Sequence, residues 1–281
     1  GFRLMYTSRP TAGGVALAFP AILKILPTLS AGSILIATVA PVLRTRDRDV
    51  VHRAIKSVVG FLMGCLLFLL IVPALLIGWQ NNLDGIRYFL EHVVLNPNFA
   101  RDWGFDIHSI RNQSLAGAVW QLTDTAFGGL GRGHDATTEA GHPFDLTAVS
   151  TATSIARWLI LAFFLATIVR LATAWRSLGD PRIAAVIFGL SCAATLVFSP
   201  VAWGHHFVQG LPAWIAIPAW LYVRGGGRTA WAFAITPPVL VLAHYILMSW
   251  AGPLGVLGVG TTVWLLFACF ATWAEASRLN R

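Results

Sequence analysis

The chain has 281 residues, of which 56% are apolar and only 11% are charged. Soluble domains carry roughly 25% charged residues, so this composition excludes a soluble globular protein. The formal charge of +8 would suit a nucleic-acid partner, but the basic residues gather in connections between apolar runs, as membrane topology requires, and we expect no nucleic acid to bind.

Long apolar runs recur along the sequence, and several approach the roughly 20 residues that cross a bilayer as a helix. They are continuous rather than alternating, which favours helices over a β-barrel. We therefore predict an all-α polytopic integral membrane protein with at least seven transmembrane helices. The seven predicted spans are 27–43, 57–78, 151–171, 183–200, 207–223, 229–249 and 254–273.

The beginning of the chain does not resemble a signal peptide. Residues 11–24 are apolar but only about 14 long, which predicts a partial or re-entrant helix. We expect residues 1–281 to form a single transmembrane domain, the C-terminal part of a longer, N-terminally truncated protein.

The connections between the predicted spans alternate in charge: every second connection is basic, and the others are not. The basic residues are Arg44, Arg46, Arg48, Arg53 and Lys56, then Arg176 and Arg182, then Arg224 and Arg228, and finally Arg278 and Arg281. The positive-inside rule makes these connections cytoplasmic and the opposite ones external. We expect a multi-pass protein of a bacterial plasma membrane, with membrane lipids as partners and a long outer loop over about 79–150.

Within this outer loop, residues 84–95 place apolar side chains at helical spacing with charged residues between them, which predicts an interfacial amphipathic helix. Residues 114–122 are a second short helical candidate.

The three cysteines, Cys65, Cys192 and Cys269, lie inside predicted spans without C-x-x-C spacing, so we interpret them as packing residues rather than disulfide or metal partners.

Three polar stretches are candidates for chemistry, because polar groups beside apolar spans are costly and tend to be functional. In Lys24-Ile25-Leu26-Pro27, Pro27 predicts a helix break that leaves Lys24 near the outer face, where its ammonium can meet an anionic head group. The alternative is a lysine that extends to the membrane surface without a ligand.

The second stretch consists of Arg111, Asn112, Gln113 and Ser114, whose amide and hydroxyl groups suit sugar hydroxyls, with Ser114 as a plain helix N-cap the alternative. The third is the outer connection 199–206, which contains Trp203, His205 and His206. Histidine can hold a phosphate oxygen, whereas adjacent histidines diverge by about 100° on a helix and chelate poorly. Phosphate contact is therefore favoured over metal, with interfacial histidines satisfied by backbone or water as the alternative.

In this order, the K-x-x-P break, the Asn-Gln-Ser-Leu element and the Ser-Pro-x-x-Trp-x-His-His turn resemble glycosyltransferase family 87, the polyprenol-phosphate-mannose-dependent mannosyltransferases of the GT-C class. The resemblance covers about residues 24–212, and its last motif is the most specific. It implies a GT-C-like helical bundle that moves a sugar from a polyprenyl-phosphate donor to a lipid or glycan acceptor on the outer side, without a metal or other cofactor.

By this resemblance, His205 or His206 contacts the donor phosphate, with Lys24 second, while Asn112, Gln113, Ser114 and Trp203 contact substrate. GT-C enzymes also carry a catalytic aspartate in the first outer loop, which acts as a general base. None of the eight acids of the outer loop occupies the matching place, so we assign no general base and expect it outside this chain.

Two other classes compete with the enzyme. A secondary transporter or flippase should carry ionisable groups near mid-membrane, and the candidates are Arg157, Arg170 and His244. The two arginines lie near span ends, where we expect them to extend to water, and His244 is either a relay or a structural histidine. A non-catalytic scaffold predicts no clustering of the motif residues.

Overall fold

The computed structural model describes residues 9–23, 25–43, 45, 47–94, 115, 146–174, 181–198, 207, 209–250 and 256–278. Every regular element within these ranges is helical, which confirms the predicted all-α class. The first half contains α2 (Pro10–Leu23), α3 (Ile25–Val39), η1 (Ala40–Leu43), α4 (Arg48–Cys65), η2 (Leu66–Ile71), α5 (Val72–Ile77), α6 (Trp79–Phe89) and η3 (Leu90–Val94). The second contains α9 (Leu146–Ala174), α10 (Pro181–Phe198), α11 (Leu211–Val223), α12 (Gly227–Trp250) and α13 (Val256–Arg278).

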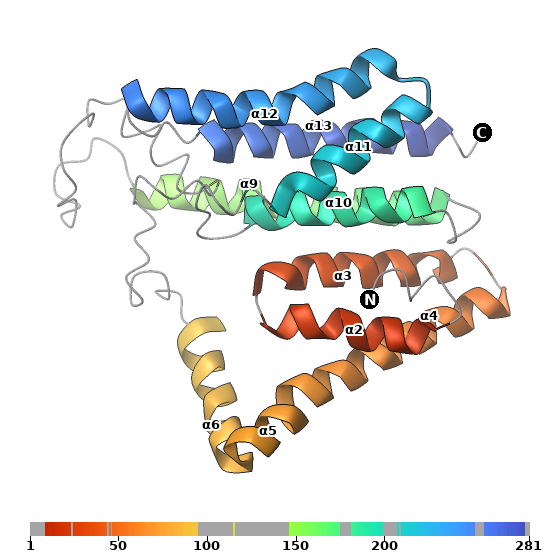
Figure 1. The fold of residues 1–281 in the computed structure, drawn as a ribbon, viewed down its shortest axis with the longest axis vertical. Coiled ribbons are helices and arrows are strands. Elements are labelled where there is room, and N and C mark those ends of the chain that lie inside the picture. The colour runs from red at the N-terminus through yellow and green to blue at the C-terminus, as the bar shows by residue number, and fades with distance from the viewer. Residues whose placement is uncertain are drawn as a thin grey trace.

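Helix α10 is the centre of the bundle and packs against α3, α9, α11 and α13 (Figure 1). Its inward side chains are fully or almost fully buried, among them Val186, Leu190, Ala194 and Val197. Gly189 lets α11 approach closely, because a Cβ at this position would lie 2.8 Å from the Cα of Ala213. The main core therefore surrounds α10.

Helices α2 and α4 form the other close pair, and small residues bring their backbones together. Gly60 and Gly64 have the G-x-x-x-G spacing that supports helix contacts in membranes. A Cβ on Gly60 would overlap the backbone carbonyl of Thr11, and one on Gly64 would lie 2.7 Å from the Cβ of Ala18. This contact fastens α2 to the long α4 helix.

Among the described residues, four helices are long and apolar enough to cross a membrane: Arg48–Ile77, Thr151–Thr173, Gly227–Ile246 and Leu257–Ser277. They correspond to four of the predicted spans, whereas those predicted over 27–43, 183–200 and 207–223 fall on shorter helices. The structure thus supports a membrane protein without confirming seven spans. The shortest of these three helices, α11, has 13 residues and reaches about 20 Å, less than the roughly 30 Å hydrocarbon core.

Helix boundaries differ from the prediction where capping decides them. The first long span begins at Arg48 rather than at residue 57, because the Asp47 side chain accepts a hydrogen bond from the Asp49 N–H at 2.9 Å and caps the helix there. Near the N-terminus, the predicted partial helix over 11–24 is confirmed as the 14-residue α2.

The two ends of the bundle differ in the connections they carry. The C-terminal ends of η1, α9, α11 and α13 lie at one end, on the right of Figure 1. In the sequence, these are the ends that the basic residues follow. The α2–α3 junction, the α5–α6 turn, the start of α9 and the end of α10 lie at the opposite end. The predicted alternation of basic and non-basic connections thus matches the direction of the helices.

Candidate functional site

All seven side chains predicted to contact substrate lie outside the described residues: Lys24, Asn112, Gln113, Ser114, Trp203, His205 and His206. Their roles and their mutual distances therefore stay predictions. Described residues flank the first motif and the connection 199–206 on both sides, and Leu115 follows the second motif.

The first motif falls at the junction of two helices. Helix α2 ends at Leu23 and α3 begins at Ile25, and Lys24 between them lies outside the described residues. We expected the break at Pro27, but Pro27 lies inside the first turn of α3. A proline is tolerated there because the first N–H groups of a helix have no partner within it. The stretch does contain the end of one helix and the start of another, as expected, but the second helix begins before Pro27.

The second motif is followed directly by a residue that is buried in the core. Leu115, which follows Ser114 in the chain, is helical and only 8% exposed, and it belongs to the main core around α10. The predicted helix over 114–122 otherwise lies outside the described residues.

The third motif lies between two anchored residues. On its N-terminal side, the Arg157 guanidinium on α9 donates a hydrogen bond to the carbonyl oxygen of Phe198, the last residue of α10. On its C-terminal side, Phe207 is 3% exposed and packs with Leu196 and Leu257. The residues on either side of the eight-residue connection 199–206 are therefore both held by contacts with the bundle.

Arg157 corrects an expectation from the sequence. We expected this arginine to extend to water, but it is only partly exposed and bonds a helix-terminal carbonyl. Its positive charge also compensates the partial negative charge of the helix dipole at the C-terminal end of α10. An arginine inside an apolar run was the signal available in the sequence, but the run does not reveal its partner.

Most buried hydroxyl groups mark no site, because they bond carbonyls of their own helices. Such bonds run from Ser33 to Leu29, from Thr167 to Phe163 and from Thr262 to Gly258, at 2.7–2.8 Å. These side chains are satisfied without a ligand.

His244 on α12 is different, since it is an ionisable side chain that is 5% exposed within a candidate span. Its ring lies edge-on to Tyr245, with centroids 5.5 Å apart. A buried histidine at this place is a candidate for a function inside the membrane.

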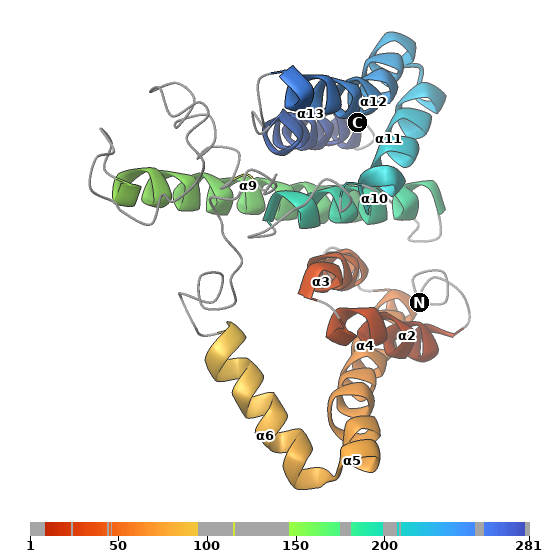
Figure 2. The ribbon, with the colours of Figure 1, turned by 60° about the vertical axis from the view of Figure 1, so that its left-hand side comes forward.

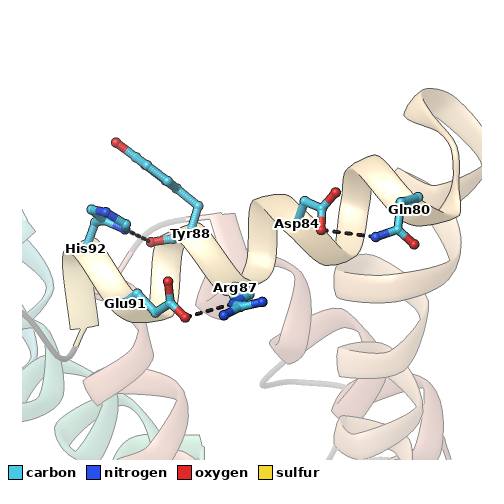
Figure 3. Close-up of polar contacts among 6 residues, drawn as sticks. All are labelled: Gln80, Asp84, Arg87, Tyr88, Glu91 and His92. Atoms are coloured by element: carbon cyan, nitrogen blue, oxygen red, sulfur yellow. Dashed lines mark hydrogen bonds and ion pairs between the residues drawn. The ribbon is translucent and has the colours of Figure 1, made fainter.

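The predicted amphipathic helix over 84–95 is confirmed as helical in α6 and η3, and it begins five residues earlier, at Trp79. Its polar residues pair at a spacing of four, as Figure 3 shows. Gln80 donates to Asp84 at 3.1 Å, and Arg87 donates to Glu91 at 2.8 Å. This hydrogen bond lowers the pKa of Glu91 and raises that of Arg87, and the opposite charges add to both effects.

Within the described ranges, no three His, Cys, Asp or Glu side chains come together as a metal site would require. No family model, no curated protein and no solved structure matches this chain.

Proposed function

We propose that the chain is the membrane-embedded part of a GT-C glycosyltransferase that moves a hexose, mannose by its resemblance, from a polyprenyl-phosphate sugar to a lipid or glycan acceptor. In this proposal the chain forms one transmembrane domain and lies in a bacterial plasma membrane. It has at least seven spans if the shorter apolar helices also cross the membrane, and the reaction takes place on the outer side.

One observation supports this proposal most strongly. The α2–α3 junction and the end of α10 lie at the same end of the bundle, opposite the basic connections (Figure 1). The chain positions of Lys24 and of the connection 199–206 are adjacent to these two points. A scaffold gives no reason for the two motifs to meet at one end, whereas a donor site requires it.

The chemistry follows from the leaving group. When the bond between the sugar and the polyprenyl phosphate breaks, negative charge develops on the phosphate oxygen. Lys24 and one of His205 and His206 would stabilise that charge as hydrogen-bond donors, without a metal. Asn112, Gln113 and Ser114 would hold sugar hydroxyls, and Trp203 would contact the substrate. The general base that removes the acceptor proton is assigned to no residue of this chain.

The experiment is transfer of radiolabelled mannose from polyprenyl phosphate mannose to membrane lipids by the full-length gene product. The variant His205→Ala/His206→Ala should lose transfer at equal expression, while the control His92→Ala should keep it. His92 is exposed on η3, and its ring contacts Tyr88 of the same helix, through the Tyr88 carbonyl oxygen at 3.1 Å and by stacking on the Tyr88 ring. No transfer by the unaltered protein, or equal transfer by both variants, would contradict the proposal.

A transporter or flippase is the second candidate, and the buried His244 favours it. Under this alternative, His244→Ala abolishes lipid or solute movement in proteoliposomes, and His205→Ala/His206→Ala does not. Under the glycosyltransferase proposal, the protein in proteoliposomes carries no lipid across the bilayer except those that it glycosylates.

A further inference from the structure

The long helix formed by α4, η2 and α5 has one backbone donor too few beside Pro73. Pro73 has no N–H, so the helical turn that precedes it contains one carbonyl more than the backbone has donors for. The π-helical turn of η2 shifts the pairing, and the Val72 N–H donates to Leu67 instead. An unpaired carbonyl in hydrocarbon costs several kcal/mol, so a donor from elsewhere is needed.

Asn82 on α6 supplies this donor. Its Nδ2 lies 3.1 Å from the Leu69 oxygen and 3.2 Å from the Leu70 oxygen, and the residue is 5% exposed. The chain returns to this point through Gly78, whose φ of +89° is a conformation that glycine adopts without strain. The turn and the amide together fix the angle at which α6 leaves α5.

Helix α6 has an apolar stripe that the described part of the bundle leaves largely exposed. Trp79, Leu83, Ile86 and Leu90 repeat at spacings of three and four, and Trp79, Leu83 and Leu90 are 57%, 37% and 45% exposed. The neighbouring face, about 100° around the helix, carries the paired polar residues of Figure 3. Within the described residues, the extensive contacts of α6 are with α5, η2 and η3.

The direction of α6 suits a membrane surface. Figures 1 and 2 show that α6 turns back from the end of α5 and runs across the end of the bundle, whereas α9, α12 and α13 run along it. This is the end opposite the basic connections. Because Ile77 ends a membrane-spanning helix and only Gly78 separates it from Trp79, α6 starts where that helix leaves the membrane.

We propose that α6 and η3 form a surface helix that lies in the outer leaflet and that Asn82 holds it there by bonding the carbonyls of Leu69 and Leu70. Trp79, Leu83 and Leu90 insert between lipid chains, and Arg87 and Glu91 face water. Residues 79–94 contain one arginine against two acids. Binding therefore rests on apolar insertion into zwitterionic lipid and gains nothing from anionic head groups.

The experiment uses the full chain in nanodiscs, with Cys65, Cys192 and Cys269 replaced by alanine. A spin label is placed by Leu83→Cys or, as the matched control on the polar face about 100° around the helix, by Asp84→Cys. Collisions with oxygen report lipid, and collisions with a water-soluble nickel complex report water. We expect the oxygen-to-nickel collision ratio to be high at position 83 and low at 84, and to be equal in phosphatidylcholine alone and with phosphatidylglycerol added.

A label at 83 that meets neither oxygen nor nickel would show protein contact, from a partner or a second copy, and would overturn the proposal. Equal ratios at 83 and 84, or deeper insertion with anionic lipid, would overturn it as well.

The role of Asn82 has its own comparison. Asn82→Leu should abolish the contrast between positions 83 and 84, whereas Asn81→Leu should preserve it. The Asn81 side chain is exposed and donates only to Ile77, four residues earlier, at 2.8 Å. A contrast that survives Asn82→Leu would contradict that role. If Asn82→Leu does not fold, the labels in the otherwise unaltered chain still test the lipid contact, and neither measurement depends on sugar transfer.

Discussion

The substitution Gly60→Ala tests how closely α2 and α4 pack. The added Cβ would overlap the Thr11 carbonyl, and that group belongs to the backbone of α2, so the two helices must separate. Overpacking of this kind costs about 1–3 kcal/mol. Alanine also favours the helix over glycine by about 0.8–1 kcal/mol, which offsets part of the cost.

Gly32→Ala on α3 isolates that second effect. Gly32 lies inside a helix like Gly60, but no atom lies within 4 Å of where its Cβ would be. The free energy of unfolding of Gly60→Ala should therefore fall below that of Gly32→Ala by about 1–3 kcal/mol. Reversible unfolding in mixed detergent micelles, followed by far-ultraviolet circular dichroism, gives both values.

Gly14→Ala extends the same test to the facing helix. Its Cβ would overlap the backbone of Ser57 and Phe61, so it separates the same pair of helices as Gly60→Ala. Once the helices have moved apart, the second methyl group costs less, and the double variant should lose less stability than the sum of the single ones. Equal stability of Gly60→Ala and Gly32→Ala would refute this account of the packing.

Three further predictions concern Arg157, Gly78 and Glu91. Arg157→Ala should lower the free energy of unfolding by about 1.5–3 kcal/mol, the range for a hydrogen bond to a charged group, while the exposed control Arg228→Ala changes little. Gly78→Ala should cost about 1–3 kcal/mol through backbone strain alone, because its nearest neighbour, the Asn81 Nδ2, is 3.9 Å away, and unchanged unfolding would contradict this. Since Arg87 lowers the pKa of Glu91, their pair supports α6 above the ordinary glutamate pKa and loses its effect as the pH falls through the lowered value. Carboxyl NMR titration should show the Glu91 midpoint rising in Arg87→Gln, and an unmoved midpoint would count against the pairing.

Much of the fold could be predicted from apolar runs and basic connections. The runs identified the helices that became α9, α12 and α13, and the alternation of basic connections matches the two ends of the bundle. Both patterns are local, since they need only the length of a run and the residues at its ends. Span length was less predictable, because α11 is shortened by a turn that begins near Phe207.

Features that depend on partners could not be predicted. The spacing of Gly60 and Gly64 is visible in the sequence, but the sequence does not show that α2 is the facing helix. Pro73 removes one backbone donor from its helix, yet nothing in the pattern shows that Asn82 returns to supply one. The partner of Arg157 is likewise 41 residues away in the chain. The candidate site was predicted from motifs alone, and its seven side chains lie outside the described residues.

The most direct test of the proposed donor site is a crosslinking map with a photoreactive analogue of polyprenyl phosphate mannose in proteoliposomes that contain the full-length protein. Mass spectrometry of the labelled peptides locates the phosphate end of the donor. We predict labelling of peptides from the end of the bundle opposite the basic connections, including residues 199–206, and its loss in His205→Ala/His206→Ala. Labelling confined to the basic connections, or labelling that the histidine substitutions leave unchanged, would contradict a donor site at this end of the bundle.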